Sequence, residues 1–342
     1  MTVNHFLERI EMCMKNANDI CIDEENYILE MQKNILPSIN KFKQTGTFQT
    51  FDGVNLFYKK FELENINGMI VIVHGFSENA DRYDELAYYF LKKNYSVYIY
   101  DQRCHGFSQK LLNNPDAIHL DNFDDYAHDL NCFLEKIVFA KNKYQSKKIF
   151  LFGHSMGGAV IARFLEIYQP TYLKLVILSA PMFEIKAKLN QAQIKNLNMH
   201  INNSEKECFY IAGKEISPQD RLRDVWYKNY KRYIYVINQE IKNHVLNKGL
   251  ISFSWLKQAF DVTEKMFVAD DIKKINLLGL KILLFQYGKD QVVGENNQNK
   301  FARIINKCEL YKIDAARHNI YFMHNGLLNQ FLNKIFCECE SI

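Results

Sequence analysis

Five short apolar runs in this sequence show no alternation between apolar and polar residues. They cover residues 69–73, 97–100, 149–152, 175–178 and 282–285. A strand without alternation is covered on both faces, which is typical of a parallel sheet with helices on either side. Segments with helical patterns fall between or after the runs, at residues 82–93, 123–141, 155–168 and 296–305. Strands that alternate with helices predict an α/β fold with a mostly parallel central sheet.

Two regions near the N-terminus predict further elements. Residues 1–44 are polar and weakly amphipathic, which predicts an N-terminal helical extension that ends at Pro37. Residues 47–51 and 54–61 are rich in strand formers, and Asp52-Gly53 between them is a hairpin turn signal. We therefore expect a β-hairpin before the first parallel strand.

Residues 184–275 interrupt the alternation of strands and helices. The segment contains amphipathic helical patches and no clear parallel strand, and one patch opens with Ser217 and Asp220 in the spacing of a capping box. We therefore expect a helical cap inserted into an α/β core. That core would comprise residues 45–183 and 276–342.

Composition and charge exclude several classes of protein. The net charge of +4, from 43 Lys and Arg against 39 Asp and Glu, is far from that of a dedicated nucleic-acid binder. The longest apolar candidate, residues 277–285, is too short for a membrane span, and Glu8 and Arg9 stand where a signal peptide is apolar. The 8 cysteines are scattered without a CxxC pair, so we expect reduced thiols and no metal site. Together these features predict a cytoplasmic protein.

The strongest local signal is the segment Gly153-His154-Ser155-Met156-Gly157. It directly follows a predicted strand and opens a predicted helix. In that context G-x-S-x-G is a nucleophile elbow, a strained turn that raises the serine hydroxyl above the sheet. Gly153 and Gly157 are needed because a Cβ would clash where the strand and the helix pass closely.

A nucleophilic serine needs a base and an acid that orients the base. Asp290 and His318 each follow a predicted strand, so both belong at the same sheet edge as Ser155. Their chain order, serine then acid then histidine, is the order of α/β-hydrolases. Asp314 is a rival acid, but it lies only four residues before His318 and we interpret it as a turn residue.

The same chemistry requires two backbone N–H groups that stabilise an oxyanion. One donor is expected from Met156, the residue after the nucleophile. The other is expected from the loop after the first parallel strand, which begins His74-Gly75-Phe76. Gly75 lets the chain turn there, so the N–H of Phe76 is the natural second donor.

At this point the chain resembles the α/β-hydrolase fold, and within it the bacterial lysophospholipase L2 and monoacylglycerol-lipase-like serine hydrolases. The resemblance spans about residues 45–335 and rests on an ordered set of motifs. These are His74-Gly75-Phe76, Arg82-Tyr83-Asp84-Glu85-Leu86-Ala87, Asp101 to Ser108, Asp121 to Tyr126, the elbow, Ser179 to Phe183, Gly288-Lys289-Asp290 and Ala316-Arg317-His318.

The resemblance implies that Ser155, Asp290 and His318 form a catalytic triad. It also implies that Phe76 and Met156 are the oxyanion donors, and that neither a cofactor nor a metal is needed. The chain departs from the family at two positions. Cys104 stands where the family usually has glycine, which predicts a local backbone adjustment, and Asn319 stands where lysophospholipases often have glutamate.

The expected cap carries the information on substrate. Residues 185–275 contain 16 Lys and Arg against 10 Asp and Glu. Its aromatic residues include Trp226, Tyr227, Tyr230, Tyr233, Tyr235, Phe253 and Trp255. Basic side chains beside amphipathic aromatics suit an anionic lipid surface, whereas an ordinary aromatic core under a solvated basic face fits the composition equally well. The resemblance favours a lysophospholipid or monoacylglycerol substrate and transient contact with the inner face of the membrane.

Three alternatives stay open at this stage. A general carboxylesterase of the same fold would use the same triad. An aminopeptidase-like hydrolase would want an acidic patch to hold a free amine, and Glu184 and Asp220 are the acids to consider. A lipid-binding module without activity is the third, although it would have no need of Asp290 or His318.

Overall fold

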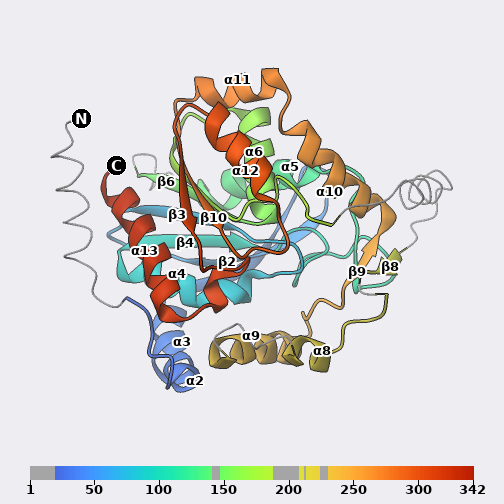
Figure 1. Cartoon of the computed structure of the whole chain (residues 1–342). Coiled ribbons are helices and arrows are strands. Elements are labelled where there is room, and N and C mark those ends of the chain that lie inside the picture. Colours follow the sequence, from blue (N-terminus) through green and yellow to red (C-terminus); the bar gives the residue numbers. More distant parts are fainter. Residues whose placement is uncertain (1–19, 141–146, 188–207, 212, 224–229) are drawn as a thin grey trace.

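The central element of the fold is an eight-stranded sheet (Figure 1). The computed structural model describes residues 20–140, 147–187, 208–211, 213–223 and 230–342. The strands lie in the order β1-β2-β4-β3-β6-β7-β10-β11. Their bounds are β1 Lys43–Gln49, β2 Asn55–Phe61, β3 Gly68–Val73, β4 Tyr95–Tyr100, β6 Ile149–His154, β7 Leu173–Ser179, β10 Lys281–Tyr287 and β11 Cys308–Ile313.

The pairing confirms the predicted mostly parallel sheet. β1 and β2 form the expected antiparallel hairpin, with Gly53 at a φ of 86° in the turn, and β2 also runs antiparallel to β4. From β4 to β11 every neighbouring pair is parallel. The five strands β4, β3, β6, β7 and β10 are almost wholly buried, which explains their lack of alternation.

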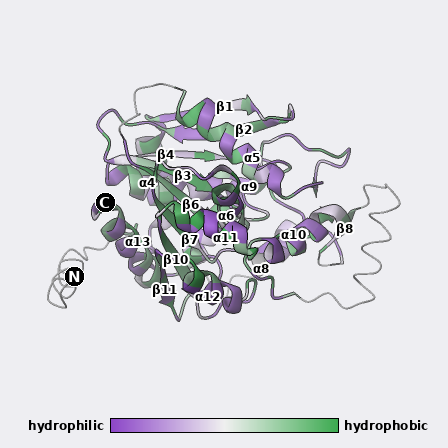
Figure 2. Cartoon of the chain, turned by 90° about the horizontal axis from the view of Figure 1, so that it is seen from above, coloured by the Kyte–Doolittle hydropathy of each residue, from purple (hydrophilic) through white to green (hydrophobic). Residues whose placement is uncertain are grey.

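Helices cover both faces of the sheet. In Figure 1, α4 and α13 lie on one side, and α5, α6, α11 and α12 lie on the other. Figure 2 shows hydrophobic residues concentrated in the central strands, where the core sits. The bounds are η2 Ala80–Tyr83, α4 Asp84–Lys92, α5 Asp124–Phe133, η3 Leu134–Val138, α6 Met156–Tyr168, α11 Ala269–Leu277, α12 Glu295–Ile304, η5 Ile320–Phe322 and α13 Asn325–Glu340.

The strand order reverses between β3 and β6. From β3 the chain moves outward to β4, and then returns to the opposite side of β3 to form β6. At such a switch point the loops after the two strands diverge and leave a crevice at their carboxyl ends. The loop that begins at His74 and the elbow at Ser155 are the two loops that meet there.

The N-terminal extension differs from its prediction in one respect. The described part contains α2 Tyr27–Glu30, the π-helical turn η1 Met31–Ile35 and α3 Leu36–Asn40, and residues 1–19 lie outside the described residues. The prediction that the helix ends at Pro37 is wrong, because the helix continues to Asn40. Pro37 has no N–H to donate to the residue four positions before it. The π turn that ends at Ile35 already interrupts this i to i−4 bonding, so the proline is tolerated there.

The segment predicted as a helical cap contains helices and two short strands. The helices are α8 Pro218–Arg223, α9 Tyr230–Lys242 and α10 Phe253–Lys265. The prediction missed β8 Cys208–Tyr210 and β9 Leu250–Ser252, which form a small sheet with β5 Ala117–Ile118. Strands of two or three residues are too short to give a sequence pattern. The capping box is confirmed, because Ser217 and Asp220 exchange side-chain to backbone hydrogen bonds.

Two cysteines and the apolar segments bear on further predictions from the sequence. Cys337 is disulfide-bonded, so the expectation of reduced thiols is wrong at that position. Cys104 has a φ of 66°, so it adopts the left-handed conformation that favours glycine. Across the described part of the chain, no helix is long and apolar enough to cross a bilayer.

Arg232 of α9 joins four parts of the molecule. Its side chain is buried and donates to both carboxylate oxygens of Glu85 in α4, at 2.8 Å from Nε to Oε2 and 3.0 Å from Nη2 to Oε1. Nη1 donates to Met323 O at 2.9 Å, near the start of α13. Tyr27 of the N-terminal extension donates to Glu85 at 2.8 Å. Tyr27, α4, α9 and the start of α13 therefore share one buried charge cluster.

We expect Arg232→Ala to lower the free energy of unfolding by about 3–5 kcal/mol, because it leaves the Glu85 carboxylate buried without its cation. Lys93→Ala is the matched control. It removes a pair with Glu340 whose side chains are 41% and 57% exposed, and should cost less than about 1 kcal/mol. Urea denaturation of both variants measures the difference. Equal losses for the two would contradict the role given to Arg232.

Candidate active site

The predicted elbow has the backbone conformation that a nucleophile turn requires. Ser155 lies between β6 and α6 with φ 50° and ψ −116°, a strained region for a residue with a side chain. Its carbonyl accepts hydrogen bonds from the N–H groups of Gly158 and Met182, both at 2.9 Å. A Cβ on Gly157 would lie 2.0 Å from Val73 O, so only glycine lets α6 approach the end of β3.

Of the three residues predicted as a triad, His318 lies within hydrogen-bond distance of both Ser155 and Asp290. His318 Nε2 is 2.9 Å from Ser155 Oγ, and His318 Nδ1 is 2.7 Å from Asp290 Oδ2. Ser155 and Asp290 are each 6% exposed, while the His318 side chain is 13% exposed. Residues that are 135 and 28 positions apart in the sequence thus meet at one sheet edge.

Asp290 is held as an ionised acceptor. Burial acts to raise the pKa of its carboxyl, but the hydrogen bond and charge of His318 outweigh burial and hold that pKa below its ordinary value. The backbone N–H groups of Val292 and Val293 donate to Oδ1 at 2.7 and 3.1 Å. The rival Asp314 is exposed and pairs with Lys312 instead.

The loop after β3 has a fixed peptide orientation. His74 is buried, and its Nε2 accepts from Gln102 N–H at 3.0 Å, so its proton must be on Nδ1. That Nδ1 donates to Gly75 O at 2.8 Å, and burial lowers the pKa of His74 to about 4, which keeps the ring neutral. Because the peptide is planar and trans, the Phe76 N–H points away from His74.

The second predicted donor is the N–H of Met156. Met156 is the first residue of α6, and the first N–H groups of a helix have no partner within it. Within the described residues, neither the Phe76 N–H nor the Met156 N–H donates to another protein group. Both groups therefore remain able to donate to a ligand oxygen.

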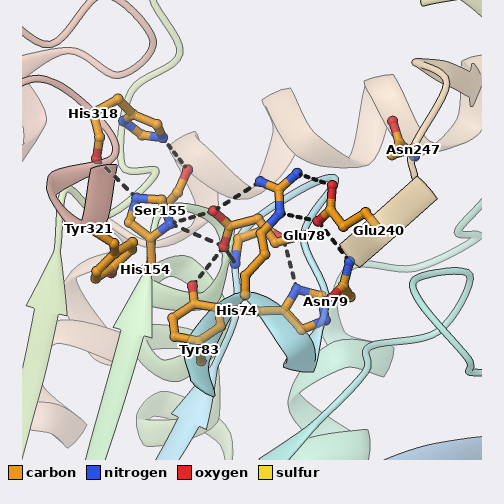
Figure 3. Close-up of polar contacts among 12 residues, drawn as sticks. His74, Glu78, Asn79, Tyr83, His154, Ser155, Glu240, Asn247, His318 and Tyr321 are labelled. Atoms are coloured by element: carbon orange, nitrogen blue, oxygen red, sulfur yellow. Dashed lines mark hydrogen bonds and ion pairs between the residues drawn. The ribbon is translucent and has the colours of Figure 1, made fainter. Parts of the chain in front are cut away.

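A buried ion-pair network behind the triad was not predicted from the sequence (Figure 3). Both Glu78 carboxylate oxygens lie 3.2 Å from His154 Nδ1, and His154 Nε2 lies 3.1 Å from His318 O. Because a carbonyl only accepts, Nε2 must carry a proton, and the carboxylate favours a second proton on Nδ1. Burial acts to lower the pKa of His154, but Glu78 outweighs burial and raises it.

The network continues from Glu78 into the predicted cap. Arg82 lies 3.8 Å from Glu78 and forms a bidentate pair with Glu240 of α9, whose second contact is 3.0 Å from Nη2 to Oε2. Asn79 also donates to Glu240, at 2.9 Å. Glu240 of α9 is thereby connected to the backbone of His318 through Arg82, Glu78 and His154, whose side chains are at most 10% exposed. His154 lies inside the elbow motif, but no local signal in the sequence marks Glu240 as the distant partner of Arg82.

We expect His154→Gln to destabilise the protein more at about pH 6 than at about pH 9, because the pair with Glu78 exists only while His154 is protonated. A histidine with a raised folded pKa contributes stability below its ordinary value of 6.5 and loses it as pH rises through the folded value. Glu78, whose pKa is lowered, stays ionised throughout. Urea denaturation at both pH values measures the difference. A loss that is constant or grows with pH would contradict a charged His154.

Comparisons with known proteins agree with this geometry. Residues 64–323 match the family described as serine aminopeptidase, S33 (Hydrolase_4). The chain is 26% identical to the probable lysophospholipase L2 of Haemophilus influenzae over 78% of this chain and 84% of that protein. It is 31% identical to a monoglyceride lipase homolog of monkeypox virus over 74% and 82%.

A solved structure agrees with the fold at lower sequence similarity. The monoacylglycerol lipase of Paleococcus ferrophilus superposes with a TM-score of 0.62 at 18% identity, covering 83% of this chain and 99% of that one. The predicted fold is therefore confirmed. The chain belongs to the serine aminopeptidase S33 family of α/β-hydrolases.

Proposed function

We propose that this protein is a serine hydrolase that cleaves carboxylic esters of single-acyl-chain lipids, lysophospholipid or monoacylglycerol. The observation that carries the proposal is the double hydrogen bond of His318, to Ser155 at 2.9 Å and to Asp290 at 2.7 Å. A histidine between a strained serine and a buried carboxylate is the arrangement that activates a serine hydroxyl.

In the first half of the reaction, Ser155 Oγ attacks the acyl carbonyl while His318 Nε2 takes its proton. Asp290 accepts from Nδ1, which fixes the tautomer and stabilises the imidazolium that forms. The negative charge on the former carbonyl oxygen is stabilised by the N–H groups of Phe76 and Met156. His318 then protonates the leaving alcohol, and an acyl-enzyme on Ser155 remains.

In the second half, water replaces the alcohol. His318 takes a proton from the water as its oxygen attacks the acyl-enzyme carbonyl, and the same two N–H groups stabilise the charge. Collapse of the intermediate returns the proton to Ser155 Oγ and releases the fatty acid.

The substrate class is supported by the relatives and by the proposed cap at residues 184–275. Two relatives carry the names lysophospholipase and monoglyceride lipase homolog. The net basic charge of the cap supports transient contact with an anionic membrane surface. Of the two interpretations of the aromatic residues, the aromatic core fits Trp255, Tyr233 and Tyr235, which are buried, while Tyr230 is 59% exposed. Trp226 and Tyr227 lie outside the described residues.

The alternatives are less well supported. Glu184 accepts from the N–H of Asn297 in the first turn of α12, and the Asp220 carboxylate accepts from the N–H of Ser217 at the start of α8. Both acids considered for holding a free amine therefore already serve helix ends. A binding module without activity would not need a buried carboxylate that orients a histidine. A general carboxylesterase differs only in the acyl chain that it accepts.

We expect Ser155→Ala to abolish ester hydrolysis and Asp290→Asn to lower kcat by about 10³- to 10⁴-fold, because the histidine loses its orienting acceptor. Asp314→Asn is the matched control and should keep activity close to that of the unmodified protein. Hydrolysis of p-nitrophenyl butyrate measures all three. Full activity of Ser155→Ala would overturn the proposal, and a reversed effect of the two aspartates would reassign the acid.

The substrate class is tested by comparing kcat/KM for lysophosphatidylcholine, monooleoylglycerol, p-nitrophenyl acetate and an aminoacyl p-nitroanilide. We expect one of the two lipids to be the best substrate. Preference for the short acetate would indicate a general carboxylesterase, and preference for the anilide would indicate an aminopeptidase. Either preference would overturn the lipid assignment.

A further inference from the structure

The cap contacts the proposed oxyanion loop through an aromatic stack. The ring of Phe76, in the loop after β3, lies against the indole of Trp255, in the first turn of α10. Their centroids are 4.3 Å apart and their planes differ by 33°. Two aromatic rings in such a close, tilted contact attract each other beyond the effect of burying their area. Phe76 thus has its backbone in the candidate active site and its side chain on the cap.

Trp255 is held firmly on its own side of the stack. Its side chain is buried, and its indole N–H donates to the buried Tyr126 hydroxyl of α5 at 3.2 Å. Its backbone N–H donates to the Oγ of Ser252, the N-cap of α10, at 3.0 Å. Ser252 ends β9, which pairs with β5 of the core, and His119 Nδ1 lies 2.9 Å from its Oγ. Burial and two hydrogen bonds therefore fix the position of the indole ring.

The loop that carries Phe76 needs such support. Ser77 has a φ of 61°, a conformation that is unfavourable for a non-glycine residue and persists only where the surroundings enforce it. On the N-terminal side, Gly75 N–H is held by Glu78 at 2.7 Å and Gly75 O by His74. The Phe76 ring is confined by Trp255 on its face and by His105, whose ring centroid is 6.0 Å away in an edge arrangement.

We infer that Trp255 is a positioning residue for the oxyanion hole. By fixing the Phe76 ring it restrains the backbone of residues 75–77, and so keeps the Phe76 N–H aimed at the oxygen that becomes negative. The inference rests on the proposed function, because it takes that N–H as an oxyanion donor. It means that the cap takes part in stabilising the transition state, beyond enclosing an acyl chain.

The test compares p-nitrophenyl butyrate with its thionoester, in which sulfur replaces the carbonyl oxygen. Sulfur accepts hydrogen bonds poorly, so a thionoester gains little from the oxyanion hole. We expect Trp255→Leu to lower kcat for the oxygen ester by about 10- to 100-fold, part of the effect of losing one donor, with a small change in KM. The thionoester rate should fall much less, so the oxygen-to-sulfur rate ratio should drop. Trp255→Phe should restore most of the ratio.

Two further variants separate positioning from general damage. Phe76→Leu removes the other ring of the stack while keeping the backbone donor, and the double variant with Trp255→Leu should be no worse than either single variant in the rate ratio. Phe209→Leu disrupts a similar stack with Phe253 inside the cap, whose centroids are 4.6 Å apart, and should leave the ratio unchanged. Circular dichroism and thermal melting verify that each variant is folded.

An unchanged ratio in folded Trp255→Leu would overturn the inference, whether the variant loses kcat on both esters or only raises KM. Should Trp255→Leu fail to fold, Phe76→Leu decides the question by the same ratio. If Ser155→Ala is inactive while the ratio does not move, the proposed function stands and only the role of Trp255 fails. If Ser155→Ala is active, the proposed function itself fails.

Discussion

The structure depends on a close approach between three backbone segments at the carboxyl ends of β3 and β6. Gly157 allows α6 to approach Val73 so tightly that no side chain fits between them. This contact holds Ser155 in its strained conformation and brings the loop from His74 to Glu78 beside it. A side chain at position 157 would force α6, whose first residue follows Ser155, away from the end of β3.

A second constraint fixes α9 of the proposed cap against the core. Arg232 and Glu240 lie eight residues apart on α9, so both fall on the same face of the helix. Each pairs with an oppositely charged partner in the segment from η2 to α4, Arg232 with Glu85 and Glu240 with Arg82. In both segments the positive residue precedes the negative one, so the two pairs form only when the segments run in opposite directions and in one register. Because the charges are buried, a shifted register would leave unpaired ions in the interior.

Local patterns predicted much of the fold and the whole candidate triad. The buried strands, the elbow and the acid and histidine after their strands each give a signal within a few residues. The paired charges of Arg82 with Glu240 and of Glu85 with Arg232 give none, because the partners lie about 150 residues apart and resemble surface charges in the sequence. β8 and β9 are too short for a pattern, and the continuation of the helix through Pro37 depends on a π turn that composition does not reveal. The burial of Trp255 likewise follows from tertiary packing. Composition alone allowed this residue to lie either on a lipid-facing surface or in an aromatic core.

The central claim is that folding makes Ser155 a nucleophile through His318 and Asp290. The most direct measurement is the reaction of the folded protein with a fluorophosphonate, followed by mass spectrometry of its peptides. The account predicts one phosphonyl group per chain, located on Ser155, with labelling much slower when His318 is replaced by alanine. A protein that stays unlabelled, or that is labelled at another residue, would contradict it.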